Sequence, residues 1–79
     1  DIAVVDPPRS GLERTALDAL ISMKPSIIAY VSCDPATLAR DAKRITHAGY
    51  LLRSVQPFDL FPQTYHIESI GLFETGQRN

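Results

Sequence analysis

Short apolar runs alternate with amphipathic segments along most of this chain. Residues 2–5 and 27–31 are continuous apolar runs, which are typical of strands buried in a parallel sheet. Between them, residues 13–23 carry apolar side chains at helical spacing, and Pro25 ends that segment. We therefore predict a helix between two strands.

The rest of the chain repeats this alternation. Residues 35–48 predict a second helix, with Leu38, Ala42 and Ile45 on its apolar face. The charged residues that fall largely off that face are Arg40, Asp41, Lys43 and Arg44. Residues 51–55 predict a third strand, residues 58–63 a loop and residues 66–73 a fourth strand. The connection is too short for a crossover helix, so we expect the last two strands to be antiparallel.

The order strand–helix–strand–helix–strand–strand predicts an α/β fold with a mostly parallel sheet. In open sheets of this kind, ligands bind outside the carboxyl ends of the strands. Residues 6–9 and 32–35 each follow a predicted parallel strand, so we expect them to be neighbours at one edge. With 79 residues, the chain is one small domain at most.

The composition of the chain limits the kinds of partner and the cellular compartment that we expect for it. The net charge of −1 argues against a free-standing nucleic-acid binder, which would be basic. One cysteine excludes an internal disulfide and provides no metal cluster, so we expect a reducing cytoplasm and no metal. No stretch is long and apolar enough to predict a membrane span. Because the chain opens at Asp1 inside a strand-like run, we expect it to be a piece of a longer protein.

The single cysteine, Cys33, lies at the turn between an apolar run and the second predicted helix. Asp34 suits the N-cap of that helix, and Pro35 suits its first position. Unpaired N–H groups and a partial positive charge at a helix start favour the thiolate, which is the nucleophilic form. A small cysteine used only for packing fits the same pattern, so this turn alone leaves both interpretations open.

Two further clusters carry polar side chains suited to chemistry. Asp6 and Arg9 flank two prolines that fix the direction of the carboxylate, although a local ion pair is the simpler interpretation. His66 and Glu68 are two residues apart on a predicted strand and share a face, where Glu68 can act as a general base or simply be solvated. A cysteine–histidine hydrolase would use Cys33 with His66 and Glu68, but no glycine-rich oxyanion element lies near the cysteine.

Three motifs together resemble the carboxyl-terminal part of the RNA uracil-5-methyltransferase family, which acts on transfer and ribosomal RNA. They are Asp-Pro-Pro-Arg-Ser-Gly at 6–11, Tyr-Val-Ser-Cys-Asp-Pro-Ala-Thr-Leu-Ala-Arg-Asp at 30–41 and Asp-Leu-Phe-Pro-Gln-Thr-Tyr-His-Ile-Glu at 59–68. The first motif alone is weak, whereas the second and third in this order are very specific. The third is most similar to the bacterial ribosomal RNA members. Asp34 stands where many members have asparagine.

The resemblance implies a class I, Rossmann-like methyltransferase fold, of which residues 1–79 are the second half of the sheet. It implies S-adenosylmethionine as cofactor and RNA, most closely 23S ribosomal RNA, as partner. Cys33 matches the nucleophile that adds to carbon 6 of uracil, and Glu68 matches the base that removes the proton from carbon 5. Asp6 matches a residue between cofactor and target base, and Arg9 and His66 are further candidates for substrate binding.

The parts that the family places before this segment are its glycine-containing cofactor loop, its acidic ribose-binding strand and its RNA-binding domain. We therefore expect the full-length protein to be an enzyme and the segment alone to be inactive. Two alternatives stay open. The segment can be a non-catalytic α/β interaction module derived from such an enzyme, with exposed strands covered by self-association. The parent can also be a different class I nucleic-acid methyltransferase.

Overall fold

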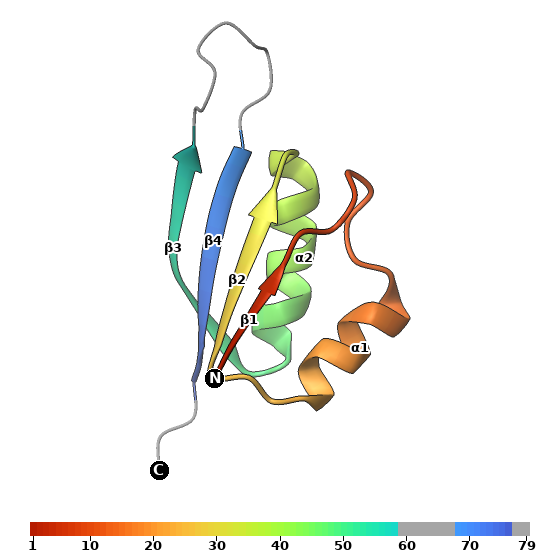
Figure 1. Cartoon of the computed structure of the whole chain (residues 1–79), viewed down its shortest axis with the longest axis vertical. Coiled ribbons are helices and arrows are strands. Elements are labelled where there is room, and N and C mark those ends of the chain that lie inside the picture. Colours follow the sequence, from red (N-terminus) through yellow and green to blue (C-terminus); the bar gives the residue numbers. More distant parts are fainter. Residues whose placement is uncertain (59–67, 77–79) are drawn as a thin grey trace, which may run out of the picture.

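Strands and helices follow one another in the order that the hydrophobic pattern predicts. The computed structural model describes residues 1–58 and 68–76. Its elements, drawn in Figure 1, are β1 (Ile2–Val5), α1 (Arg14–Ser22), β2 (Ile27–Ser32), α2 (Pro35–His47), β3 (Tyr50–Phe58) and β4 (Glu68–Thr75). β3 continues beyond the predicted end at residue 55. Most of the predicted loop at 58–63, and residues 66 and 67, lie outside the described residues.

The strands form one sheet in the order β1-β2-β4-β3. β1 and β2 are parallel, and β4 lies between β2 and β3 and is antiparallel to both. The predicted antiparallel pairing of the last two strands is therefore confirmed. β1, β2 and β3 share one direction, as a mostly parallel sheet requires, but insertion of β4 leaves β1 with β2 as the one parallel pairing in the described part of the chain.

Both helices bury their apolar sides in one core against the sheet. The fully buried members are Ile28 and Tyr30 of β2, Phe73 of β4 and Ile45 of α2. Ile28 and Phe73 are register partners, so they occupy the same face of neighbouring strands. The core side chains that α1 contributes are Leu17 and Leu20. Neither helix in the described residues is long and apolar enough to cross a membrane.

The opposite face of the sheet is apolar and open. Val4, Ala29 and Leu72 lie in one row across β1, β2 and β4, and Val4 is 69% exposed and Leu72 38% exposed. Residues 2–5 were expected to form a buried strand, and this expectation is wrong for Ile2 and Val4. β1 is an edge strand, and no described helix covers this side, so water reaches both side chains.

Candidate active site

Asp6 and Cys33 follow two neighbouring parallel strands at the same end of the sheet. Val5 at the end of β1 pairs with Tyr30 near the end of β2, and Asp6 and Cys33 are the residues that follow the two strands. Figure 1 shows the two chain segments leaving the sheet on the same side. The predicted adjacency is confirmed, with Asp6 exposed and Cys33 half-buried.

Glu68 reaches this end of the sheet from the neighbouring antiparallel strand. Ser32 of β2 pairs with Ser69 of β4. Cys33 comes directly after Ser32 and Glu68 directly before Ser69, so antiparallel pairing brings both to the same end of the two strands. Glu68 is half-buried. His66 and the rest of the third motif, residues 59–67, lie outside the described residues.

The turn that carries Cys33 is fixed by hydrogen bonds on both sides of it. The Asp34 N–H donates to Ser32 Oγ over 3.1 Å, and the Ser32 hydroxyl donates to the Asp34 carbonyl oxygen over 2.9 Å. Asp34 Oδ1 also accepts from the N–H of Ala36 at 2.9 Å and of Thr37 at 3.4 Å. Asp34 is thus the predicted N-cap, and the thiol stands at a defined helix start.

One buried carboxylate of α2, Asp41, is not among the residues that the sequence pattern predicts to be functional. Asp41 was expected off the apolar face of its helix, yet it is fully buried. Its Oδ2 accepts from the Tyr30 hydroxyl at 2.5 Å and the Leu12 N–H at 2.9 Å. Its Oδ1 accepts from Arg44 Nη1 at 2.8 Å and Arg40 Nη2 at 3.2 Å. These donors replace water, and a buried carboxylate needs such replacement.

The position of Asp41 was visible in the helical pattern. It lies three residues after Leu38 and four before Ile45, which is the spacing of one helix face. An acidic residue at that spacing, inside an otherwise apolar stripe, indicates a buried carboxylate with partners from elsewhere. The pattern alone does not identify those partners, because they include Tyr30 on β2 and Leu12 on the segment after β1.

The same helix holds the segment that joins β1 to α1. Thr37 Oγ1 donates to the Arg9 carbonyl oxygen at 2.9 Å, and Arg40 Nη2 donates to the Ser10 carbonyl oxygen at 2.7 Å. Arg44 Nη1 donates to the carbonyl oxygen of Leu12 at 2.9 Å. The loop that begins with Asp6 is therefore tied to the helix that begins after the cysteine.

Gly11 makes this close approach possible. Its φ is +93°, in the region that favours glycine, and its N–H donates to the Pro8 carbonyl oxygen at 2.8 Å. A Cβ on Gly11 would lie 2.6 Å from the Thr37 methyl carbon and 2.7 Å from Asp41 Oδ2. The first motif thus needs glycine at this position, because the chain packs closely against the second motif there.

The hydrogen bonds at Asp41 determine its charge. Burial acts to raise the pKa of Asp41, but the bonds from Tyr30, the Leu12 N–H, Arg44 and Arg40 outweigh it, and the pKa lies below the usual value of 3.8. Burial raises the pKa of Tyr30, and its bond to the Asp41 carboxylate raises it further. Asp41 is therefore ionised at neutral pH, with the Tyr30 phenol neutral as its donor.

Comparison with known proteins gives one consistent family. The family model described as tRNA (uracil-5-)-methyltransferase matches residues 1–75. An RNA methyltransferase of Listeria innocua is 53% identical over 70 residues, which are 89% of this chain and 16% of that protein. One of Aquifex aeolicus is 55% identical over 74 residues, which are 94% of this chain and 17% of that protein. The chain thus spans under a fifth of the length of these relatives.

A solved structure from the same family shares the fold of this chain. Pyrococcus abyssi tRNA (uracil-54, C5)-methyltransferase, in complex with S-adenosyl-L-homocysteine, superposes with a TM-score of 0.77 and 40% identity. The match covers 92% of this chain and 18% of that protein. The sheet described here is therefore part of a class I methyltransferase fold.

The lowered pKa of Asp41 predicts a loss of stability in acid. Because the folded-state pKa lies below the unfolded one, the unfolded chain binds the proton first as the pH falls. The stabilisation is complete above about pH 5 and is lost as the pH falls through the folded-state pKa. Tyr30→Phe removes one donor, so its free energy of unfolding at pH 7 should be lower than that of the unmodified chain by about 1 kcal/mol. Between neutral pH and about pH 3, the variant should then lose less stability than the unmodified chain.

Urea unfolding at a series of pH values measures this difference. Asp18→Asn is the matched control, because Asp18 is an exposed carboxylate on α1. Its acid dependence should follow that of the unmodified chain. Equal acid dependence in Tyr30→Phe and the unmodified chain would contradict the assignment of the pKa shift to this hydrogen bond.

Proposed function

Because the chain belongs to the tRNA (uracil-5-)-methyltransferase family, we propose that the full-length protein methylates carbon 5 of a uridine in RNA. The observation that carries the proposal is that Asp6, Cys33 and Glu68 lie at the same end of the sheet. A carboxylate, a thiol and a second carboxylate are the groups that this reaction needs from the protein. The activity is proposed for the whole protein.

S-adenosylmethionine is the proposed cofactor. It fits the groups present, because the carboxylate of Asp6 is exposed at the carboxyl end of β1, where ligands of open α/β sheets bind. Asp6 would hold it together with residues outside this chain. When bound, the cofactor supplies a methyl group carried on a positively charged sulfur.

Cys33 is the proposed nucleophile. Carbon 5 of uracil is too weak a nucleophile to accept a methyl group directly. Addition of the Cys33 thiolate to carbon 6 forms a covalent bond there and moves the ring electrons into an enolate, which is nucleophilic at carbon 5. The capped turn between Ser32 and Asp34 gives the sulfur a fixed position for this attack.

Glu68 is the proposed base that completes the reaction. After methylation, carbon 5 carries both a proton and a methyl group. The Glu68 carboxylate takes the proton, the electron pair restores the ring double bond, and the Cys33 thiolate leaves carbon 6. Arg9 and His66 are proposed to contact the substrate. A base in folded RNA must be turned out of its stack to reach these groups.

Ribosomal RNA, specifically 23S, is the proposed substrate class. The support is the motif Pro-Gln-Thr-Tyr-His-Ile-Glu at 62–68, which is most similar to bacterial ribosomal RNA members. The family description and the solved neighbour are both named for transfer RNA, so transfer RNA is the competing substrate. We also propose that the protein works in the cytoplasm, where RNA is processed.

Cys33→Ala in the full-length protein should abolish methyl transfer to RNA. The substitution removes one half-buried sulfur and no hydrogen bond described here, so the fold and the cofactor affinity should be retained. Incorporation of labelled methyl groups, measured separately with ribosomal and transfer RNA, gives the readout. A folded variant with normal turnover would show that Cys33 is not the nucleophile.

Glu68→Gln should stop the reaction after methyl transfer. The amide keeps the size of the side chain but cannot accept the proton from carbon 5, so the Cys33–uracil bond should persist. A covalent protein–RNA adduct should accumulate on a denaturing gel. Glu74→Gln is the control, because Glu74 lies on the same strand at its other end, paired with Arg53. A slow Glu68→Gln enzyme without an adduct would assign Glu68 another role.

The 79-residue chain by itself should bind no S-adenosylmethionine and should self-associate. It supplies Asp6 and the Cys33 turn, whereas a glycine-rich turn for the amino acid group is not among its motifs. The open apolar row of Val4, Ala29 and Leu72 favours association between copies. Calorimetric titration and sedimentation test the two statements. Saturable binding at micromolar cofactor would contradict the first, and a strictly monomeric chain would contradict the second.

A further inference from the structure

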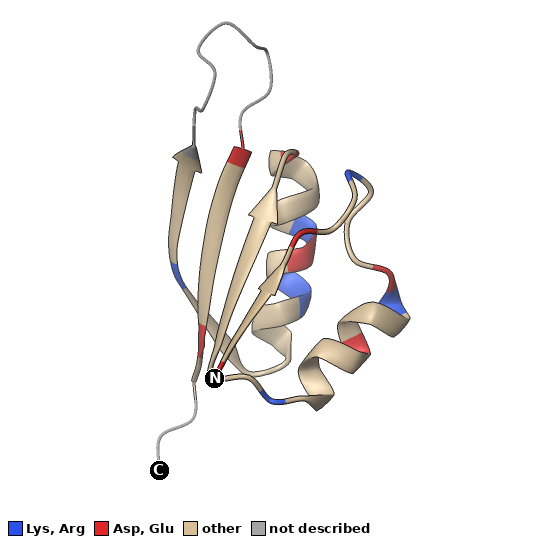
Figure 2. Ribbon diagram, in the orientation of Figure 1, with Lys and Arg blue, Asp and Glu red and all other residues tan. Residues whose placement is uncertain are grey.

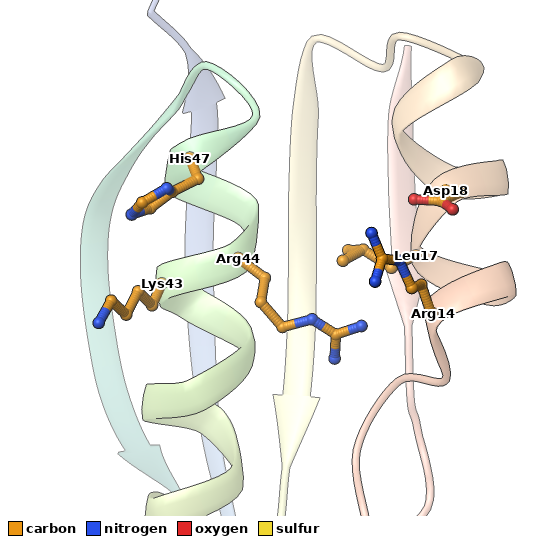
Figure 3. Close-up of a pocket in the computed structure, with 6 residues that line it drawn as sticks. All are labelled: Arg14, Leu17, Asp18, Lys43, Arg44 and His47. Carbon is orange, nitrogen blue, oxygen red and sulfur yellow. The ribbon is translucent and has the colours of Figure 1, made fainter.

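A groove lies between α1 and α2, on the helical layer of the molecule and apart from the strand ends. Its open volume is about 420 Å³. Figure 3 shows the residues that line it: Arg14, Leu17 and Asp18 of α1 with Lys43, Arg44 and His47 of α2. A second hollow continues from it along α1 and adds Ile21 and Ser22 to the lining. The groove is therefore elongated, with apolar side chains among its polar ones.

Two guanidinium groups face one another across this groove. Figure 3 shows Arg14 pointing from α1 toward α2 and Arg44 pointing from α2 toward α1, with Leu17 between the helices. Arg44 is held in this position because its Nη1 donates to the Leu12 carbonyl oxygen at 2.9 Å and to Asp41 Oδ1 at 2.8 Å. Among the described residues, its Nε and Nη2 have no acceptor.

The groove carries an excess of positive charge, although the whole chain has a net charge of −1. Figure 2 shows basic residues on both helices. Within residues 1–58 and 68–76, Arg14 and Lys43 form no ion pair, and the buried Asp41 is shared by Arg40 and Arg44. Asp18 is the one carboxylate in the lining. Arg14 faces Arg44 across the groove, and the single carboxylate that pairs with Arg44 is already shared with Arg40. The cations therefore outnumber the carboxylates here, which raises the local potential and favours an anion between the two guanidinium groups.

We propose that this groove binds a backbone phosphate of the RNA substrate, at a distance from the uridine that is methylated. The inference rests on the proposed function, which supplies the RNA. Guanidinium groups match phosphate oxygens with paired hydrogen bonds, and Arg44 is already oriented for them. The extension of the groove past Leu17 and Ile21 suits a ribose-phosphate strand. A contact of this kind fixes the position of the RNA and carries no sequence information.

Salt dependence of RNA binding by the full-length protein tests the proposal. Arg14→Ala removes one wall of the groove and breaks no hydrogen bond among the described residues. It should weaken RNA binding and reduce the slope of log K against log salt by about 1, the loss expected for one phosphate contact. Arg53→Ala is the matched control, because Arg53 is an exposed arginine on β3 bound to Glu74. It should leave the slope unchanged, and unchanged cofactor affinity checks the fold of both variants.

Asp18→Asn supplies a test in the opposite direction. It removes the one carboxylate of the lining, so RNA should bind more tightly than to the unmodified protein. If Arg14→Ala keeps the original slope, or Asp18→Asn fails to tighten binding, the proposal is wrong. The proposal is also wrong if inorganic phosphate binds saturably to the unmodified protein but not to Arg14→Ala, while the two proteins bind RNA with the same affinity. The groove would then be a site for a small anion. Methyl transfer to RNA by the unmodified protein tests the proposed function separately.

Discussion

The carboxylate of Asp41 is shielded from water and has to be satisfied by the protein. Its donors come from three places that are distant in sequence: the Leu12 N–H after β1, the Tyr30 hydroxyl on β2 and two arginines of α2. Leaving a buried charge of this kind without its cationic partners costs about 3–5 kcal/mol. Because that is a large part of the stability of a small domain, separation of the loop, the strand and the helix is strongly disfavoured while the carboxylate is charged.

This constraint connects the core to the end of the sheet where Asp6, Cys33 and Glu68 lie. α2 begins two residues after Cys33, and the same helix holds the carbonyl groups of Arg9, Ser10 and Leu12. The segment that starts at Asp6 and the turn that carries the thiol are thus fixed to one rigid element. β4 adds Glu68 through its pairing with β2. The covalent chemistry proposed for the full-length protein would need such fixed geometry, because small displacements of reacting groups slow a reaction strongly.

Local features were predictable from the sequence, and long-range ones were not. The bounds of β1, the cap at Asp34 and the start of α2 follow from neighbouring residues alone, and the structure confirms them. The position of β4 between β2 and β3 depends on pairings between residues about 45 apart, such as Ile28 with Phe73. The partners of Asp41 come from segments up to 29 residues away. The exposure of Val4 depends on what covers the sheet, which hydrophobicity does not encode.

Amide hydrogen exchange of Leu12 in the 79-residue chain tests most directly whether the buried carboxylate holds the loop in place. Leu12 precedes α1, and its N–H donates to Asp41 Oδ2 instead of to a backbone carbonyl of a strand or helix. We expect this amide to exchange nearly as slowly as the core amides of β2, because it opens only when the core opens. Exchange of Leu12 at the rate of an exposed loop, with the β2 amides still protected, would contradict it.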